Sequence, residues 1–184
     1  MFDSNALDPE DPNSNDLLGS LTEGEQVPYA NFALLYGRAK ASQVVFTKEL
    51  QQRLLGSKTW KGIVVQSCHP GMPPSHIKAN SNMFPFKGAV NSTMWDREDG
   101  IAAYGKASEG VRKTLKAVSV SSAEGAATPL FLATSPEATE PENLGGFAFR
   151  TTWRWTPSWM DESPRREGLW ARWEKDSGIA VHFS

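Results

Sequence analysis

A short run of β-branched residues constrains this fold most, because it follows a long helical pattern and has few other strands with which to pair. Apolar residues recur with a period close to 3.6 from Asn31 to Leu55, which predicts an amphipathic helix that ends near Gly56. The next segment, Gly62–Ser67, is rich in Ile and Val and predicts a buried strand. A helix followed by a buried strand is typical of a parallel α/β sheet.

The remaining segments predict mostly loop and helix. Residues 1–28 are acidic and polar, with many Asp, Asn, Ser, Pro and Gly residues, and predict a loop. Ile101–Val118 predicts a second helix. Ser121 and Glu124 have the spacing of a capping box, which predicts that a third helix begins there. Gly145–Phe149 predicts a short last strand, and two strands are too few for a complete parallel sheet.

Composition and charge exclude several classes of protein. The chain has 184 residues, the length of one domain, and no stretch is apolar for long enough to cross a membrane. The net charge of −2 provides no general attraction to nucleic acid or anionic lipid. The first residues do not have the pattern of a secretory signal, and Cys68 is the only cysteine. We therefore expect a cytoplasmic protein without an internal disulfide.

The most informative polar residues are Tyr36 and Lys40, which lie one turn apart on the first predicted helix and so share a face. A positive charge near a tyrosine favours the phenolate and lowers the tyrosine pKa. A tyrosine tuned in this way can exchange a proton with a carbonyl oxygen, and a nearby ammonium group can also hold sugar hydroxyls. The spacing by itself fits an ordinary solvated helix face better, so the pair needs its context.

Three blocks of sequence provide that context. The first runs from Tyr36 to Leu54, the second is Gly62–Ser75 with the turn His69-Pro70-Gly71, and the third is Gly125–Glu137. In this order and spacing they resemble the active-site helix, the following strand and turn, and the late helix of the short-chain dehydrogenase/reductase family. The resemblance covers residues 29–174 and is closest to retinol dehydrogenase-like and WW-domain oxidoreductase-like members.

The resemblance implies an NAD(P)-dependent oxidoreductase that acts on a carbonyl or alcohol. It implies that Tyr36 is the catalytic acid or base and that Lys40 is the catalytic residue that tunes it. It also implies that NAD(P) is held by Tyr36, Lys40, Pro70, Gly71 and Ser75.

Residues 72–95 occupy the place of the substrate pocket in the family, and their Met and aromatic content predicts a small apolar substrate. Cys68, His69 and His76 fit no standard zinc spacing, so we expect no metal site. The tail from Arg150 is rich in Trp and Arg, with acidic residues interleaved. This pattern favours a packing segment with Arg over Trp rings rather than a nucleic-acid surface.

The chain departs from the family before Tyr36, where no glycine-rich dinucleotide-binding turn and no catalytic serine occur. We therefore expect residues 29–184 to be the C-terminal part of a Rossmann-like, doubly wound parallel sheet whose N-terminal nucleotide-binding half is missing. This chain alone is then expected neither to bind NAD(P) tightly nor to turn over substrate. The alternative is a non-catalytic remnant that acts as an interaction or dimerisation module, with helix 36–55 as the surface of a homo-oligomer.

Overall fold

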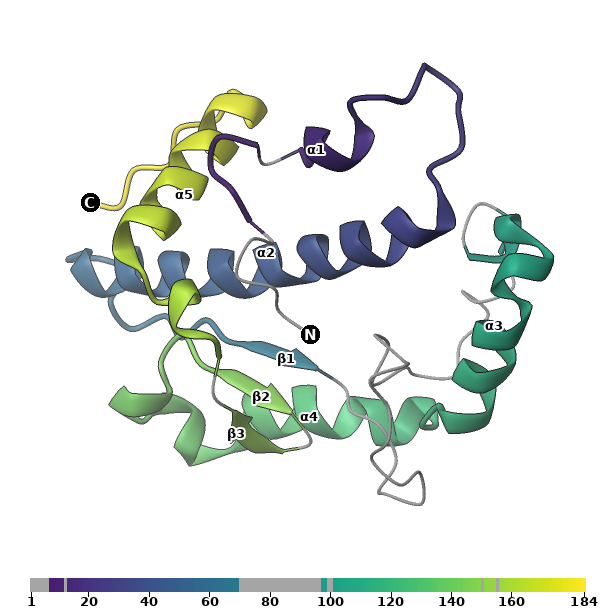
Figure 1. Ribbon diagram of the computed structural model, residues 1–184. Helices are drawn as coiled ribbons and strands as arrows, with labels where there is room; N and C mark the ends of the chain where they lie inside the picture. The colour runs from purple at the N-terminus through teal and green to yellow at the C-terminus, as the bar shows by residue number, and fades with distance from the viewer. Residues whose placement is uncertain (1–6, 12, 70–96, 99–100, 150, 155) are drawn as a thin grey trace. The chain divides into compact units, whose positions relative to one another are not determined.

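The computed structural model describes residues 7–11, 13–69, 97–98, 101–149, 151–154 and 156–184 of this protein (Figure 1). The described chain folds into two compact units, of which the first contains residues 1–67, 135–147 and 153–184 and the second contains residues 68–134 and 148–152. The elements occur in the order α1 (Asn15–Leu18), α2 (Tyr29–Gly56), β1 (Ser67–His69), η2 (Ile101–Tyr104), α3 (Lys106–Val118), α4 (Ser122–Thr134), η3 (Pro136–Thr139), η4 (Pro141–Asn143), β2 (Phe147–Phe149), β3 (Thr152–Arg154), η5 (Ser158–Met160) and α5 (Ser163–Ser177).

Helix α2 is the main element of the first unit, and it confirms the helix predicted from Asn31 to Leu55. It has 28 residues and ends at Gly56, as the sequence pattern indicates. Good helix formers fill its second half, and Ala41 and Val45 on one face are completely buried. This face packs against α5, and the two helices lie side by side in Figure 1. The core between them contains Leu7, Ala41, Val44, Val45, Trp159, Met160 and Leu169.

The Trp- and Arg-rich tail is a packing segment, as predicted. It contains β3, η5 and α5, and Trp159 and Trp170 are both buried. The guanidinium group of Arg53 lies over the Trp170 ring at 4.5 Å from its centroid, and that of Arg165 lies 5.3 Å from the Trp159 centroid. The first of these cation–π contacts joins α2 to α5, and the second lies within the tail.

The first strand does not lie where the sequence predicts it. Strand β1 begins at Ser67, at the end of the predicted segment, whereas Ile63 and Val64 are 44% and 37% exposed. The side chain of Gln51 explains the shift, because its amide nitrogen donates to the Ile63 carbonyl at 3.3 Å and its oxygen accepts from the Val65 N–H at 2.7 Å. A helix side chain therefore satisfies the backbone groups that a neighbouring strand would otherwise satisfy.

The three strands form one small sheet in the order β1-β2-β3. β1 and β2 run in the same direction in Figure 1, and the short link between β2 and β3 reverses the chain, so the sheet is mixed. Strand β2 confirms the prediction for Gly145–Phe149, whereas β3 was not predicted. The fold is thus a mixture of helices and sheet, in agreement with the α/β class.

Helices α3 and α4 belong to the second unit. The predicted helix Ile101–Val118 is divided at Gly105 into η2 and α3. Gly105 has a φ of +52°, which is outside the helical region and which glycine adopts readily. The predicted capping box is confirmed, because the Ser121 hydroxyl accepts from the Glu124 N–H at 3.2 Å and the Glu124 carboxylate accepts from the Ser121 N–H at 2.9 Å. Pro129 lies inside α4.

Candidate functional site

Tyr36 and Lys40 lie on the same face of α2, as the spacing predicts. The Lys40 Nζ is 5.7 Å from the centroid of the Tyr36 ring, and it also donates a long hydrogen bond of 3.5 Å to the Gln43 side-chain oxygen. Tyr36 is 37% exposed, so its ring is reachable from solvent. An ammonium group over an aromatic face is attracted by the ring's quadrupole, which keeps the two side chains together.

The pKa of Tyr36 shifts in the direction opposite to that expected from its neighbour. Burial raises this pKa above its ordinary value of 10.0. The prediction that Lys40 lowers it is therefore not met, because removal of the phenol from water penalises the charged phenolate. In this structure Tyr36 is a protonated phenol at neutral pH.

An ion pair lies on the side of α2 opposite to these two residues, because Arg38 is two positions from each of them. Arg38 donates two hydrogen bonds to Asp16, of 2.6 and 2.8 Å, in the planar fork geometry that arginine makes with carboxylates. The bonds from Arg38 hold the pKa of Asp16 below its usual range. They tie the acidic N-terminal segment with α1 to the N-terminal half of α2.

The residues predicted to follow the strand are described only in part. Pro70, Gly71 and Ser75 lie outside the described residues, and so does His76. His69, the last residue of β1, has its ring centroid 5.4 Å from that of Phe149 on β2, and burial lowers its pKa. Of the predicted site residues, the structure thus describes Tyr36 and Lys40, which it brings together on α2.

Cys68 is half-buried, and burial raises the pKa of its thiol above the ordinary value. A thiol with a raised pKa is a weak nucleophile and a weak metal ligand at neutral pH, because both roles need the thiolate. Within the described part of the chain, no three His, Cys, Asp or Glu residues are grouped closely enough to hold a metal ion. The described helices also include none that is sufficiently long and apolar to span a bilayer.

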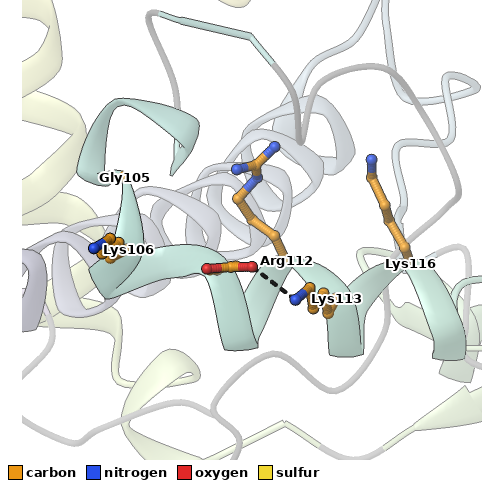
Figure 2. A pocket seen from close by; sticks show the side chains of 6 residues that line it. Gly105, Lys106, Arg112, Lys113 and Lys116 are labelled. Atoms are coloured by element: carbon orange, nitrogen blue, oxygen red, sulfur yellow. Dashed lines mark ion pairs between the residues drawn. The ribbon is translucent and has the colours of Figure 1, made fainter.

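The sequence interpretation missed a charged feature in the second unit. A pocket of about 440 Å³ lies along α3, where its lining consists of Gly105, Lys106, Glu109, Arg112, Lys113 and Lys116 (Figure 2). The signal was present as four cationic side chains within eleven residues of a predicted helix.

Comparisons with known proteins identify no relative. No family model matches the chain, and no similar protein was found among curated proteins or among solved structures.

Proposed function

We propose that this chain contributes the active-site helix of an NAD(P)-dependent oxidoreductase of the short-chain dehydrogenase/reductase type. The observation that carries the proposal is the pairing of Lys40 with Tyr36, with the ammonium 5.7 Å from the centroid of a partly exposed phenol ring. We also propose that β1 is a strand of a Rossmann-like, doubly wound parallel sheet and that α2 is one of the helices of that fold.

The donors of this pair suit a dinucleotide. Lys40 has three N–H donors and Tyr36 has a hydroxyl, which match the hydroxyl groups of a ribose. When bound, a nicotinamide dinucleotide supplies the hydride. In the proposal Lys40 binds and orients the ribose, and Pro70, Gly71 and Ser75 form the remainder of the cofactor surface. Residues 72–95 would shape the pocket for a small apolar carbonyl or alcohol.

The proposed role of Tyr36 is proton transfer at its phenolic oxygen. A protonated phenol is the form that can donate to a carbonyl oxygen as that oxygen becomes an alkoxide. Since burial raises the pKa of Tyr36, the protonated form predominates over the physiological range. This state favours the reductive direction, in which Tyr36 acts as an acid.

The test compares two tyrosines on the same helix. Tyr36 and Tyr29 both lie on α2, and burial raises the pKa of each, so Tyr29→Phe is a matched control for Tyr36→Phe. The protein is isolated from its source cell, its intact mass is determined, and its oxidation of NADPH or NADH is followed by absorbance with apolar aldehydes and ketones. The same assay is run on the purified 184-residue chain.

The expected result is a loss of about 100-fold or more in kcat for Tyr36→Phe, because general acid catalysis contributes on that scale. Tyr29→Phe should retain kcat, and Lys40→Met should weaken cofactor binding. A protein from the source cell that oxidises neither NADPH nor NADH would refute the proposal. A Tyr36→Phe variant with unchanged kcat would also refute it.

The second candidate is an interaction or dimerisation module, and the exposure of apolar side chains on α2 favours it. Phe46 and Leu55 within segment 36–55 are each 42% exposed, and Leu34 just before it is 50% exposed. Because Phe46 is stacked on Trp170 within the fold, with 5.3 Å between the ring centroids, Leu55 is the apolar side chain of this segment that a partner would contact. Leu55→Gln should then shift a dimer toward the monomer in sedimentation velocity, whereas Leu34→Gln should not. A monomeric wild-type chain would exclude this homo-oligomer.

A further inference from the structure

Positive side chains gather along one face of α3. Lys106, Arg112, Lys113 and Lys116 line the pocket of about 440 Å³, and Glu109 provides the one carboxylate among the described lining residues. Figure 2 shows Arg112 and Lys116 directed to the same side of the helix, one turn apart. The local excess of positive charge contrasts with the net charge of −2 for the whole chain.

The opposite face of α3 holds the helix in place. Ser108 and Leu115 are 0% and 2% exposed, and Val111 between them is half-buried. Ser108 is bonded through its hydroxyl to the Gly105 carbonyl at 3.0 Å. Because these side chains are packed inside the second unit, the cationic face is directed toward the pocket and toward solvent.

The cations already hold one anion, the carboxylate of Glu109. Lys113 forms an ion pair of 2.7 Å with it, and both side chains are more than half exposed. The hydrogen bond from Lys113 and then its charge hold the pKa of Glu109 below its usual range, and the charge of Arg112 acts in the same direction. A carboxylate therefore lies at the point where the fields of neighbouring cations meet.

We propose that this pocket binds the phosphate group of a small phosphorylated molecule. The phosphate oxygens can accept hydrogen bonds from the lysine ammonium groups. Two of them can also accept parallel hydrogen bonds from the guanidinium group of an arginine. The volume is within the range of small-ligand sites. A multiply charged phosphate also competes well with the singly charged Glu109 carboxylate for the same cations.

The described lining argues against larger anionic partners. None of the described residues that line the pocket is aromatic, whereas single-stranded nucleic acids are held by aromatic stacking as well as charge. The cations from Lys106 to Lys116 extend over about 15 Å of helix, which is short for a nucleic-acid track. The apolar face of α3 is buried within its unit, so the helix has no apolar face to insert into a bilayer.

The experiment is a titration of the full 184-residue chain with inorganic pyrophosphate, followed by ¹⁵N–¹H NMR at low ionic strength. The amide signals of residues 105–117 should shift in a saturable manner, and added salt should weaken the binding. No saturable shift with pyrophosphate, or shifts spread equally over the lysines of α2 and α5, would overturn the proposal.

Variants with opposite expected effects make the test specific. Lys106→Gln and Lys116→Gln should each weaken pyrophosphate binding by about twofold to fivefold, whereas Glu109→Gln should strengthen it by a similar factor. An unfolded variant cannot bind more tightly, so the Glu109→Gln result does not depend on the stability of the others. The matched control is Lys175→Gln, which removes one exposed positive charge from α5. An equal effect of the control, or weaker binding by Glu109→Gln, would contradict the assigned site.

A second arm distinguishes the source of the phosphate group. Phosphatidylcholine vesicles that contain phosphatidic acid are sedimented with the same variants. Pyrophosphate binding without vesicle binding supports a soluble ligand, and binding of both supports a phospholipid headgroup as the source of the same chemistry. Binding to vesicles or to single-stranded DNA without saturable pyrophosphate binding would overturn the proposal. Turnover by Tyr36 does not enter any of these readouts.

Discussion

The carboxylate of Glu49 is a buried charge that joins α2 to α5, and its neutralisation is the most informative test of the packing in the first unit. Its side chain is 6% exposed, and it accepts from the Arg53 Nε at 2.9 Å and from the Arg166 Nε at 3.3 Å. Glu49 and Arg166 are 117 residues apart in the sequence. Glu49→Gln preserves the size of the side chain and removes its charge.

The expected loss in the free energy of unfolding depends on the partners that each guanidinium group keeps when Glu49 is replaced. Breaking a fully buried ion pair by removing one partner costs about 3–5 kcal/mol. Arg53 is 31% exposed and also lies over Trp170, and Arg166 donates to the Asp161 carbonyl, so neither cation loses all of its partners. We therefore expect Glu49→Gln to lower the free energy of unfolding by about 2–3 kcal/mol, below the fully buried limit.

The assay is urea unfolding monitored by the fluorescence of the seven tryptophans, which include Trp170 beneath Arg53. Glu142→Gln is the matched control, because Glu142 is an exposed glutamate of the same unit, and it should change the free energy of unfolding by less than about 0.5 kcal/mol. The double variant Glu49→Leu/Arg166→Met should lose less stability than Glu49→Gln, since it leaves no uncompensated charge from that pair. A loss below about 0.5 kcal/mol for Glu49→Gln would refute the reasoning that this ion pair stabilises the contact between α2 and α5.

Three other substitutions test individual features of the second unit. Ser121→Ala should lower the free energy of unfolding by about 1 kcal/mol in thermal denaturation, because it removes the hydroxyl of the capping box, and an unchanged Tm would contradict that role. Thr151→Gly should raise the free energy of unfolding by about 1 kcal/mol, because Thr151 has a φ of +56° that a β-branched residue adopts only under strain; a lower Tm would show that the threonine contributes more than it costs. Burial lowers the pKa of His69 below 6.5, so the unfolded chain binds more protons near that pH, and the stability of the wild-type protein should fall as pH decreases from neutral through 6.5. His69→Gln should flatten this slope in urea midpoints measured across that range, and an equally steep slope in the variant would assign the pH dependence to other groups.

The helices were predictable because their signals are local. The 3.6-residue period and the good helix formers of α2 lie within the helix itself, and the Ser121–Glu124 capping box depends on residues three apart. The position of β1 was not predictable in the same way. It depends on Gln51, a polar residue near the C-terminal end of α2 that is 1% exposed and bonded to a segment 12 to 14 residues away.

The candidate site shows the same difference between local features, which were predictable, and features that depend on the fold. The proximity of Tyr36 and Lys40 follows from a spacing of four residues on one helix, and it was predicted. The direction of the Tyr36 pKa shift was not predicted. Desolvation depends on atoms that the fold brings close to the phenol, and these atoms are not its neighbours in the sequence. The cations of α3 were visible in the sequence, but only the burial of Leu115 shows which side of that helix faces the pocket.

The two hydrogen bonds between Gln51 and the Ile63–Val65 backbone have a consequence for the order of folding. They close a loop of 12 to 14 residues, whereas the contact of Ser67 with Gly146 closes one of 79. The difference in loop-closure entropy amounts to about 1.6 kcal/mol in favour of the shorter loop. Once α2 has formed, its glutamine can therefore hold the chain extended before any partner strand arrives. We therefore expect the segment just before β1 to be held on α2 before β2 is added from far along the chain.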